Sequence, residues 1–264
     1  MDISTVENAI KTYIKLSGNE KRKKVKEVLG ERAKEFSISM SDGIPILSHN
    51  EYGLQFVYVP GGEFIRGFTN ENQKAAEKIS KVVNANYSEM RPVKLESVSS
   101  FLITRTPILN FIKDPETEAS YVPLYCDYQE AESIAKRMKM RLPSETEWEY
   151  CVRAGGDTLF PFGDELPEEN ELERWMTQDF YDLQKSKSNE LGIYGLFTGE
   201  WTCDVFQTDF RAQTYGLTSK VIRGGGAYFW PWQDQEWVWC MSAMRMPSSD
   251  LVDNKCAFRL VFGL

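Results

Sequence analysis

Apolar residues recur at helical spacing near the start of the chain, at Val6, Ile10, Tyr13 and Ile14. Ser4 or Thr5 is the expected N-cap of the helix that they predict, and Gly18 is its expected end. The next segment, residues 19–36, is highly charged but keeps its apolar positions on one stripe, which predicts a second helix with a solvated face. We therefore expect residues 1–40 to form a helical hairpin attached to the main domain.

Two further helices are predicted in the centre of the chain. The stretch "YQEAESIAKRMKM" repeats its apolar positions every three or four residues and predicts a helix over residues 127–138. In "LPSETEWEYCVRAGG", Ser144 and Glu147 have the spacing of a capping box, and two glycines follow the last apolar position. The second helix is therefore expected over residues 144–153.

Short strand-like runs broken by glycine and proline make up most of the remaining chain. Among them, "NENQKAAEKISKVVNANY" is expected to be a helical or flexible insertion. Three C-terminal runs, "SKVIRGGGAYF", "EWVWCMSAMRM" and "KCAFRLVFGL", have the composition of strands, and Trp237 and Trp239 would share one face of the second run. Many short strands around two helices indicate an α+β fold for residues 41–264 rather than parallel βαβ units.

Composition and charge narrow the class of partner. The chain has 264 residues, of which 42% are hydrophobic and 27% charged, as in an ordinary globular protein with one substantial core. Its formal net charge of -8 argues against nucleic acid, because binding a polyphosphate requires a basic face. No apolar run approaches the roughly 20 residues of a membrane span, and the first residues lack the pattern of a secretory signal. We therefore expect a cytoplasmic protein with no membrane or nucleic-acid partner.

The cysteines and the single histidine exclude several catalytic and metal sites. Five widely spaced cysteines contain no C-x-x-C pair, so a zinc ribbon or a thioredoxin-like site is not supported, and buried reduced thiols are expected. His49 stands in the turn-like stretch "PILSHNEYG" and is expected at the surface. One histidine cannot form a His-rich metal site, and a Ser-His-Asp triad would have to use His49.

Three other motifs have structural interpretations. "RGGG" at residues 223–226 and "PGG" at residues 60–62 lack the strand-loop-helix context of a phosphate loop, so turns or close backbone contacts are expected. Glu145, Glu147 and Glu149 stand in one helix beside a capping box, which favours a solvated helix face over an acid/base pair.

The order of several sequence blocks is more specific than any single motif. In series, the chain contains "FVYVPGGEFIRG", "RPVKLESVSSFLITRTPI", "VPLYCDYQEAESIAKRM", "RLPSETEWEYCVRAGG", "FPFGDE", "GIYGLFTGEWTCD", "VIRGGGAYF" and "CAFRLVF". This series resembles the formylglycine-generating enzyme family, also called sulfatase-modifying factors, from about residue 54 to the C-terminus. The resemblance implies an elaborated C-type-lectin-like α+β fold, here with an N-terminal helical extension. Many members of the family carry no sulfatase-related activity.

The resemblance also implies a copper(I) site that this sequence does not reproduce. Family enzymes hold copper(I) with two cysteines shortly after an RGGS-like turn, because this soft ion prefers thiolates. The corresponding stretch, "GAYFWPWQDQEWVWC", lacks the expected pair; Cys240 comes later, and its nearest partner in sequence is Cys256. We therefore predict no catalytic residues and no metal cofactor. Calcium remains an option through the resemblance alone, since the usual "GNVWEW"-like block is replaced by "TGEWTCD".

The aromatic stretch after the RGGG turn is the predicted binding surface. In the family this stretch forms the wall of a groove that reads a peptide. Pro231 places it on a loop, where clustered tryptophans typically mark a recognition surface. The predicted binding residues are Tyr228, Phe229, Trp230, Trp232, Asp234 and Arg245. Trp237 and Trp239 are expected to belong to the core instead.

Three functions are compatible with these observations. The leading hypothesis is a non-catalytic binding module for a peptide or protein partner. The second is an active formylglycine-generating-type oxidase or modifying enzyme with relocated cysteines. The third is the variable ligand-binding protein of a diversity-generating retroelement, although adenine changes in AAC or AAT codons cannot yield the Trp, Gln, Glu and Met of residues 227–246. An ergothioneine-type sulfoxide synthase would need more histidines. The oligomeric state does not follow from the sequence.

Overall fold

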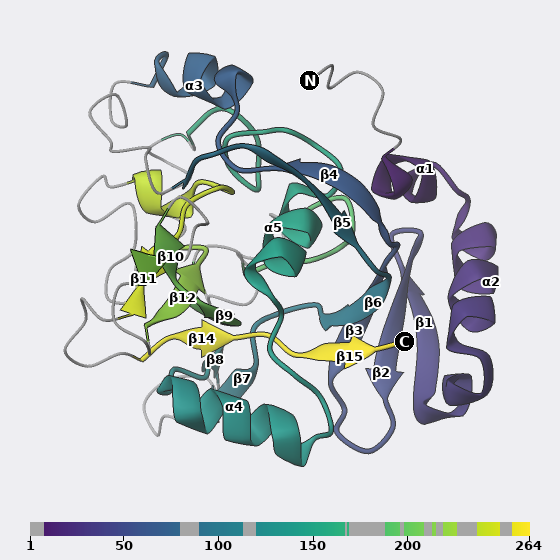
Figure 1. The fold of residues 1–264 in the computed structure, drawn as a ribbon. Helices are drawn as coiled ribbons and strands as arrows, with labels where there is room; N and C mark the ends of the chain where they lie inside the picture. The colour runs from purple at the N-terminus through teal and green to yellow at the C-terminus, as the bar shows by residue number, and fades with distance from the viewer. Residues whose placement is uncertain are drawn as a thin grey trace.

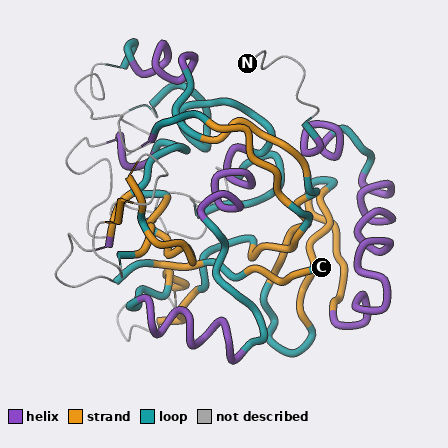
Figure 2. The backbone as a smooth tube through the Cα atoms, in the orientation of Figure 1, coloured by secondary structure: helices purple, strands orange, loops and turns teal. Residues whose placement is uncertain are grey.

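The structure is a computed structural model of the 264-residue chain (Figure 1; Figure 2). The residues that it describes are 8–79, 90–112, 120–166, 168, 188–195, 198–208, 213–214, 219–225, 237–248 and 255–264. Among these residues, no helix is both long and apolar enough to cross a bilayer.

The chain begins with helices α1 (Ala9–Ile14) and α2 (Gly18–Leu29), followed by the 3-10 helix η2 (Gly30–Glu35). The side chain of Asn8 caps α1, whereas the expected caps at positions 4 and 5 lie outside the described residues. Gly18 does not end the first helix: it opens the second, because Ser17 and Glu20 form a capping box there. The apolar faces of both helices join the main hydrophobic cluster, so this extension shares a core with the rest of the protein.

The main sheet combines strands from the first part of the chain with the C-terminal strand. Its antiparallel order is β1-β2-β3-β6-β15. The strands are β1 (Phe36–Ser41), β2 (Ile44–His49), β3 (Gln55–Val59), β6 (Phe101–Thr104) and β15 (Val261–Gly263). The surface position expected for His49 is wrong: the residue is 7% exposed in β2 and its ring stacks on Tyr52 at 4.8 Å between ring centroids. The pleat of β2 turns His49 toward the ring of Phe36, which explains its burial.

A second sheet has the order β13-β12-β9-β14, in which β14 runs parallel to β9. It contains β9 (Glu200–Val205), β12 (Lys220–Arg223), β13 (Met246–Pro247) and β14 (Ala257–Phe258). The described part of the chain also contains three two-stranded ribbons: β4 (Gly62–Arg66) with β5 (Lys94–Val98), β7 (Leu109–Ile112) with β8 (Ser120–Pro123), and β10 (Gln207–Thr208) with β11 (Gln213–Thr214). The short helix α3 (Asn70–Ala76) confirms helical structure in the predicted insertion.

Both central helices are confirmed, as α4 (Tyr128–Arg137) and α5 (Glu145–Arg153). The predicted capping box is present, since the Ser144 hydroxyl accepts from the backbone of Glu147 and the Glu147 carboxylate accepts from the backbone of Ser144. Figure 2 shows that strands and loops surround α5, while the other helices lie at the periphery. Because α5 contacts β4, β5, β9 and β12, it is buried on several faces and links the β4–β5 ribbon to the second sheet.

The predicted strand "EWVWCM" is wrong. Residues Trp237–Cys240 form a 3-10 helix, η4, and the backbone N–H of Met241 bonds to the carbonyl of Val238 at 3.2 Å. Local turn bonds therefore replace the expected ladder bonds of a strand. Trp237 is core, as predicted, and is 1% exposed in a second hydrophobic cluster. Trp239 is only half-buried and packs against the same cluster.

Candidate functional site

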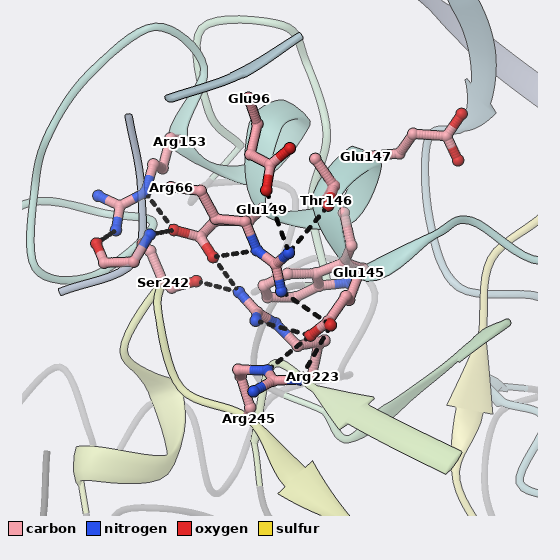
Figure 3. A network of polar contacts seen from close by, with 12 residues as sticks. Arg66, Glu96, Glu145, Thr146, Glu147, Glu149, Arg153, Arg223, Ser242 and Arg245 are labelled. Atoms are coloured by element: carbon pink, nitrogen blue, oxygen red, sulfur yellow. Dashed lines mark hydrogen bonds and ion pairs between the residues drawn. The ribbon is translucent and has the colours of Figure 1, made fainter. Parts of the chain in front are cut away.

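Two glutamates of α5 form the centre of a buried polar site (Figure 3). Glu145 and Glu149 are four residues apart and therefore share one face of the helix. They are 6% and 0% exposed, so the solvated face predicted for them is wrong. Glu147 does not join this face: its carboxylate bonds to the backbone of Ser144 and to Arg141. The sequence pattern predicts the same solvated face for all three glutamates, because their position in one helix does not reveal what packs against each face.

Glu149 is held by three donors. Its Oε1 accepts from the backbone N–H of Gly67 at 2.8 Å and from Arg153 Nε at 2.9 Å. Its Oε2 accepts from Arg223 Nη2 at 2.7 Å. Burial alone would raise the pKa of Glu149, but the charges of Arg153, Arg223 and Arg66, together with the Gly67 bond, lower it to about 2. Glu149 is therefore ionised at neutral pH.

Glu145 has a similar environment. Arg245 donates to both of its oxygens, from Nε at 2.7 Å and from Nη2 at 2.9 Å, and Arg66 Nη2 lies 2.8 Å from Oε1. Burial opposes ionisation, but the charges of Arg66, Arg245 and Arg223 outweigh it and lower the pKa of Glu145. Its backbone N–H donates to Asp204 at 2.6 Å. The first turn of α5 is thus fixed to β9 as well as to the arginines.

We call these six buried residues the arginine–glutamate network: Arg66, Glu145, Glu149, Arg153, Arg223 and Arg245. Four guanidinium groups in it face two carboxylates. Two further carboxylates balance the charge at its rim, Glu96 at 3.9 Å from Arg66 and Asp157 at 3.1 Å from Arg153. The internal carboxylates accept bonds from cations and carry no proton at neutral pH, so they are poorly suited to general-acid chemistry. The network is suited to holding β4, α5, β12 and the chain around Arg245 in one arrangement.

The RGGG turn follows directly from this network. Arg223 ends β12, and its guanidinium also lies over the Trp148 ring, 5.1 Å from the centroid. Gly224 has a φ of +93°, and a Cβ built on it would lie 2.7 Å from the carbonyl oxygen of Thr198 and 2.8 Å from Trp148 Cζ2. The close backbone contact predicted for this motif is confirmed at Gly224, where only glycine fits.

Gly224→Ala should therefore lower the free energy of unfolding by ~2 kcal/mol or more, because it combines a left-handed φ with a steric clash. Urea denaturation measures the effect. Gly263→Ala is the matched control, since a Cβ there meets nothing within 4 Å. We expect the control to change stability by less than ~0.5 kcal/mol. Equal losses in the two variants would contradict this account of the turn.

A second buried ion pair connects the two sheets. Arg259 lies between β14 and β15, and its Nε donates to Glu200 at 2.9 Å, while both residues are fully buried. Trp148 Nε1 donates to the same carboxylate at 2.8 Å. Arg259 also donates to the carbonyls of Arg105 and Tyr194 at 2.9 and 2.6 Å. The terminal "FRL" and the "GEW" blocks thus lie together, and the Glu200 carboxylate is already committed to protein donors.

Most of the predicted binding residues lie outside the described residues. These are Tyr228, Phe229, Trp230, Trp232 and Asp234, within the stretch 226–236 that we call the aromatic segment. The structure does describe both flanks: Gly225 is buried and Trp237 is 1% exposed. Arg245 is 1% exposed, and besides Glu145 it donates to the carbonyl of Gln207 at 2.9 Å. The structure places Arg245 in the network, and its role in binding stays a prediction.

Four cysteines are buried, as predicted, and Cys203 is exposed. Cys240 belongs to the second cluster and Cys256 to the main one, where Cys256 is opposite Cys126. Burial raises the pKa of the Cys240 thiol. A copper(I) ion needs two thiolates at close range, and Cys240 in its apolar surroundings does not fit that requirement. Across the described part of the chain, no three His, Cys, Asp or Glu side chains converge as a metal site would require.

Comparison with known proteins identifies the family. The profile of the sulfatase-modifying factor enzyme 1-like domain (FGE-sulfatase) matches residues 113–262, more than half of the chain. Among solved structures, PvdO from Pseudomonas aeruginosa is similar, with a TM-score of 0.55, 15% identity, and coverage of 83% of this chain and 98% of PvdO. Treponema denticola variable protein 1 gives a TM-score of 0.48 and 14% identity over 87% of this chain and 99% of that protein. None of the curated proteins matches. The α+β fold resembling formylglycine-generating enzymes is thereby confirmed, and the chain belongs to the family of sulfatase-modifying factor enzyme 1-like domains.

Proposed function

We propose that this protein is a non-catalytic binding module that recognises a peptide or protein partner through the aromatic segment. One observation carries the proposal: the segment begins and ends at buried anchors. On one side, Arg223 is held in the arginine–glutamate network, and on the other, Trp237 is packed in the second cluster. Recognition residues are usually carried by segments whose flanks are fixed by a rigid framework, as the flanks of this segment are.

The composition of the segment suits recognition. Tyr228, Phe229, Trp230 and Trp232 offer large apolar contact areas that lose little side-chain entropy on binding. Asp234 adds a carboxylate that can accept from a backbone N–H or a cationic side chain of the partner. Aromatic anchors with a few polar groups are typical of the residues that dominate binding energy at protein interfaces.

The chemistry of the described residues supports binding more than catalysis. The carboxylates of Glu145 and Glu149 are ionised and paired with arginines. The Cys240 thiol is buried and its pKa is raised, which disfavours the thiolate that nucleophilic or copper chemistry requires. In the "TGEWTCD" block, Glu200 is paired with Arg259, so it is not free to hold calcium. We therefore propose that the module works without a copper or calcium cofactor.

Trp232→Ala should weaken capture of the partner at least ~10-fold while leaving the thermal unfolding midpoint nearly unchanged. The measurement is affinity purification from the source organism with the immobilised full chain, followed by titration of the recovered partner. Tyr125→Ala is the matched control, because Tyr125 is an aromatic residue 38% exposed outside the segment. We expect the control to bind as the unsubstituted protein does.

Three outcomes would count against the proposal. Equal binding by the Trp232→Ala variant would show that the segment is not the recognition surface. A large drop in its unfolding midpoint would show that Trp232 belongs to the core. Oxidation of a cysteine-containing sulfatase peptide to formylglycine by the purified protein would favour the oxidase alternative instead.

A further inference from the structure

Two cysteines far apart in the sequence lie opposite each other in the fold. Cys126 directly precedes the N-cap of α4, and Cys256 directly precedes β14. They form an isolated antiparallel bridge. The N–H of Cys126 bonds to the carbonyl of Cys256 at 3.1 Å, and the reverse bond measures 3.0 Å. The two backbones are therefore locked in register at this one position.

This register brings the two side chains together. Residues that exchange both backbone bonds in an antiparallel pair have Cα atoms about 5.5 Å apart, within the range of about 4.4–6.8 Å that disulfides span. Their side chains also point to the same face, because the residues are directly opposite. The thiol of Cys126 adds to burial in raising the pKa of Cys256, which agrees with this proximity.

The surroundings hold the pair firmly. The carbonyl of Cys126 also accepts from Trp201 Nε1 at 2.8 Å. Both cysteines are buried, at 2% and 0% exposure, within the main cluster. Neither Cys151, whose thiol bonds to the carbonyl of Trp148, nor Cys240 in the second cluster is part of this bridge.

We propose that Cys126 and Cys256 are a modification site that forms a reversible disulfide. The two thiols together lose two protons and two electrons as the sulfur–sulfur bond forms. An oxidant of the disulfide class, such as glutathione disulfide, takes them up and leaves as two glutathione thiols. The bond would join the start of α4 to β14, and through β14 to its partner β9.

The geometry also explains why the bond would be reversible and slow to form. Opposed Cβ atoms lie about 4.5–5.5 Å apart, whereas a relaxed disulfide needs about 3.5–4.5 Å, so the bond carries strain and is readily reduced. Burial raises the pKa of Cys126 to about 12, so little thiolate is present at neutral pH. Exchange therefore depends on local opening of the bridge, and the test must begin from unfolded chain.

The full chain is refolded in a series of glutathione buffers of increasing oxidation, then blocked with a thiol reagent and mapped by mass spectrometry without reduction. We expect one cross-linked peptide pair, Cys126 with Cys256, that appears in the oxidised buffers and disappears after reduction. The cross-linked protein should also unfold at a higher urea concentration than its reduced form, because the bond closes a long loop in the unfolded chain. Cys203→Ser, at the exposed cysteine, should leave the cross-link unchanged, and Cys256→Ser should abolish it.

Free thiols at both positions in every buffer would overturn the proposal. A cross-link to a different cysteine, such as Cys240 with Cys256, would overturn it as well. Because the map is made on the unsubstituted chain, these outcomes do not depend on whether the Cys256→Ser variant folds.

Discussion

Glu149→Gln is expected to lower the free energy of unfolding by ~3–5 kcal/mol, one of the two largest losses that we predict for a single substitution. Glu149 is 0% exposed and accepts from Gly67, Arg153 and Arg223. A neutral amide leaves buried guanidinium groups without their counter-charge, and its NH2 group would face donors instead of acceptors. Urea or thermal denaturation of the purified variant measures this loss of unfolding free energy.

The matched control is Glu132→Gln, which removes an exposed pair with Lys136 on α4. We expect it to change stability by less than ~0.5 kcal/mol, because solvent screens exposed pairs. If both variants lost the same stability, the network would contribute no more than a surface pair, contrary to this prediction.

The pH dependence gives an independent check on Glu149. Folding lowers its pKa from 4.5 to about 2, so the carboxylate stabilises the fold fully above pH 4.5 and loses this contribution as the pH falls toward 2. The stability difference between the unsubstituted protein and Glu149→Gln should therefore be largest near neutrality and shrink between pH 5 and 2. A difference that stays constant over this range would argue that the substitution acts through packing and not through charge.

Trp237→Ala is expected to cost ~3–5 kcal/mol of unfolding free energy, the other large loss. Trp237 is 1% exposed, and its ring meets Phe160 and Phe162 edge to face at centroid distances of 6.5 and 6.4 Å. Removing it leaves a cavity in the second cluster, and a cavity left in a packed core is costly. The measurement is equilibrium denaturation, with near-UV circular dichroism to follow the aromatic packing.

Trp239→Ala is the comparison on the same 3-10 helix. Because Trp239 is half-buried, its loss should destabilise the protein by only ~1–2 kcal/mol. An equal loss at the two positions would indicate that both rings are core, as the sequence pattern predicted, and would contradict the burial found in the structure.

The sequence allowed the family, the α+β class and both central helices to be predicted. Ordered blocks from "FVYVPGGEFIRG" to "CAFRLVF" carried the resemblance, and the matching profile over residues 113–262 confirms it. The binding residues in the aromatic segment stay predictions, because that segment lies outside the described residues. For Arg245 the structure adds a partner, Glu145, that no pattern along the chain could reveal.

Two of the errors in the sequence predictions share one cause. Glu145, Glu147 and Glu149 were all assigned to a solvated helix face, although Glu145 and Glu149 are buried. Strand alternation was assigned to "EWVWCM", where Val238 and Met241 in fact bond to each other in a turn. In both cases, the burial or the type of structure depends on what packs against the segment. Those neighbours come from elsewhere in the chain.

What the sequence by itself determined were features governed by interactions between near neighbours. The capping box of Ser144 and Glu147 spans three residues, and the turn at Gly224 depends on a backbone conformation that glycine adopts easily. Only the tertiary structure decided which charges are buried and which cysteines lie opposite each other. Arg223 reaches Glu149 across 74 residues of sequence, and Arg245 reaches Glu145 across 100. Burying a carboxylate is favourable only when such distant cations converge on it, and that convergence is a property of the fold as a whole.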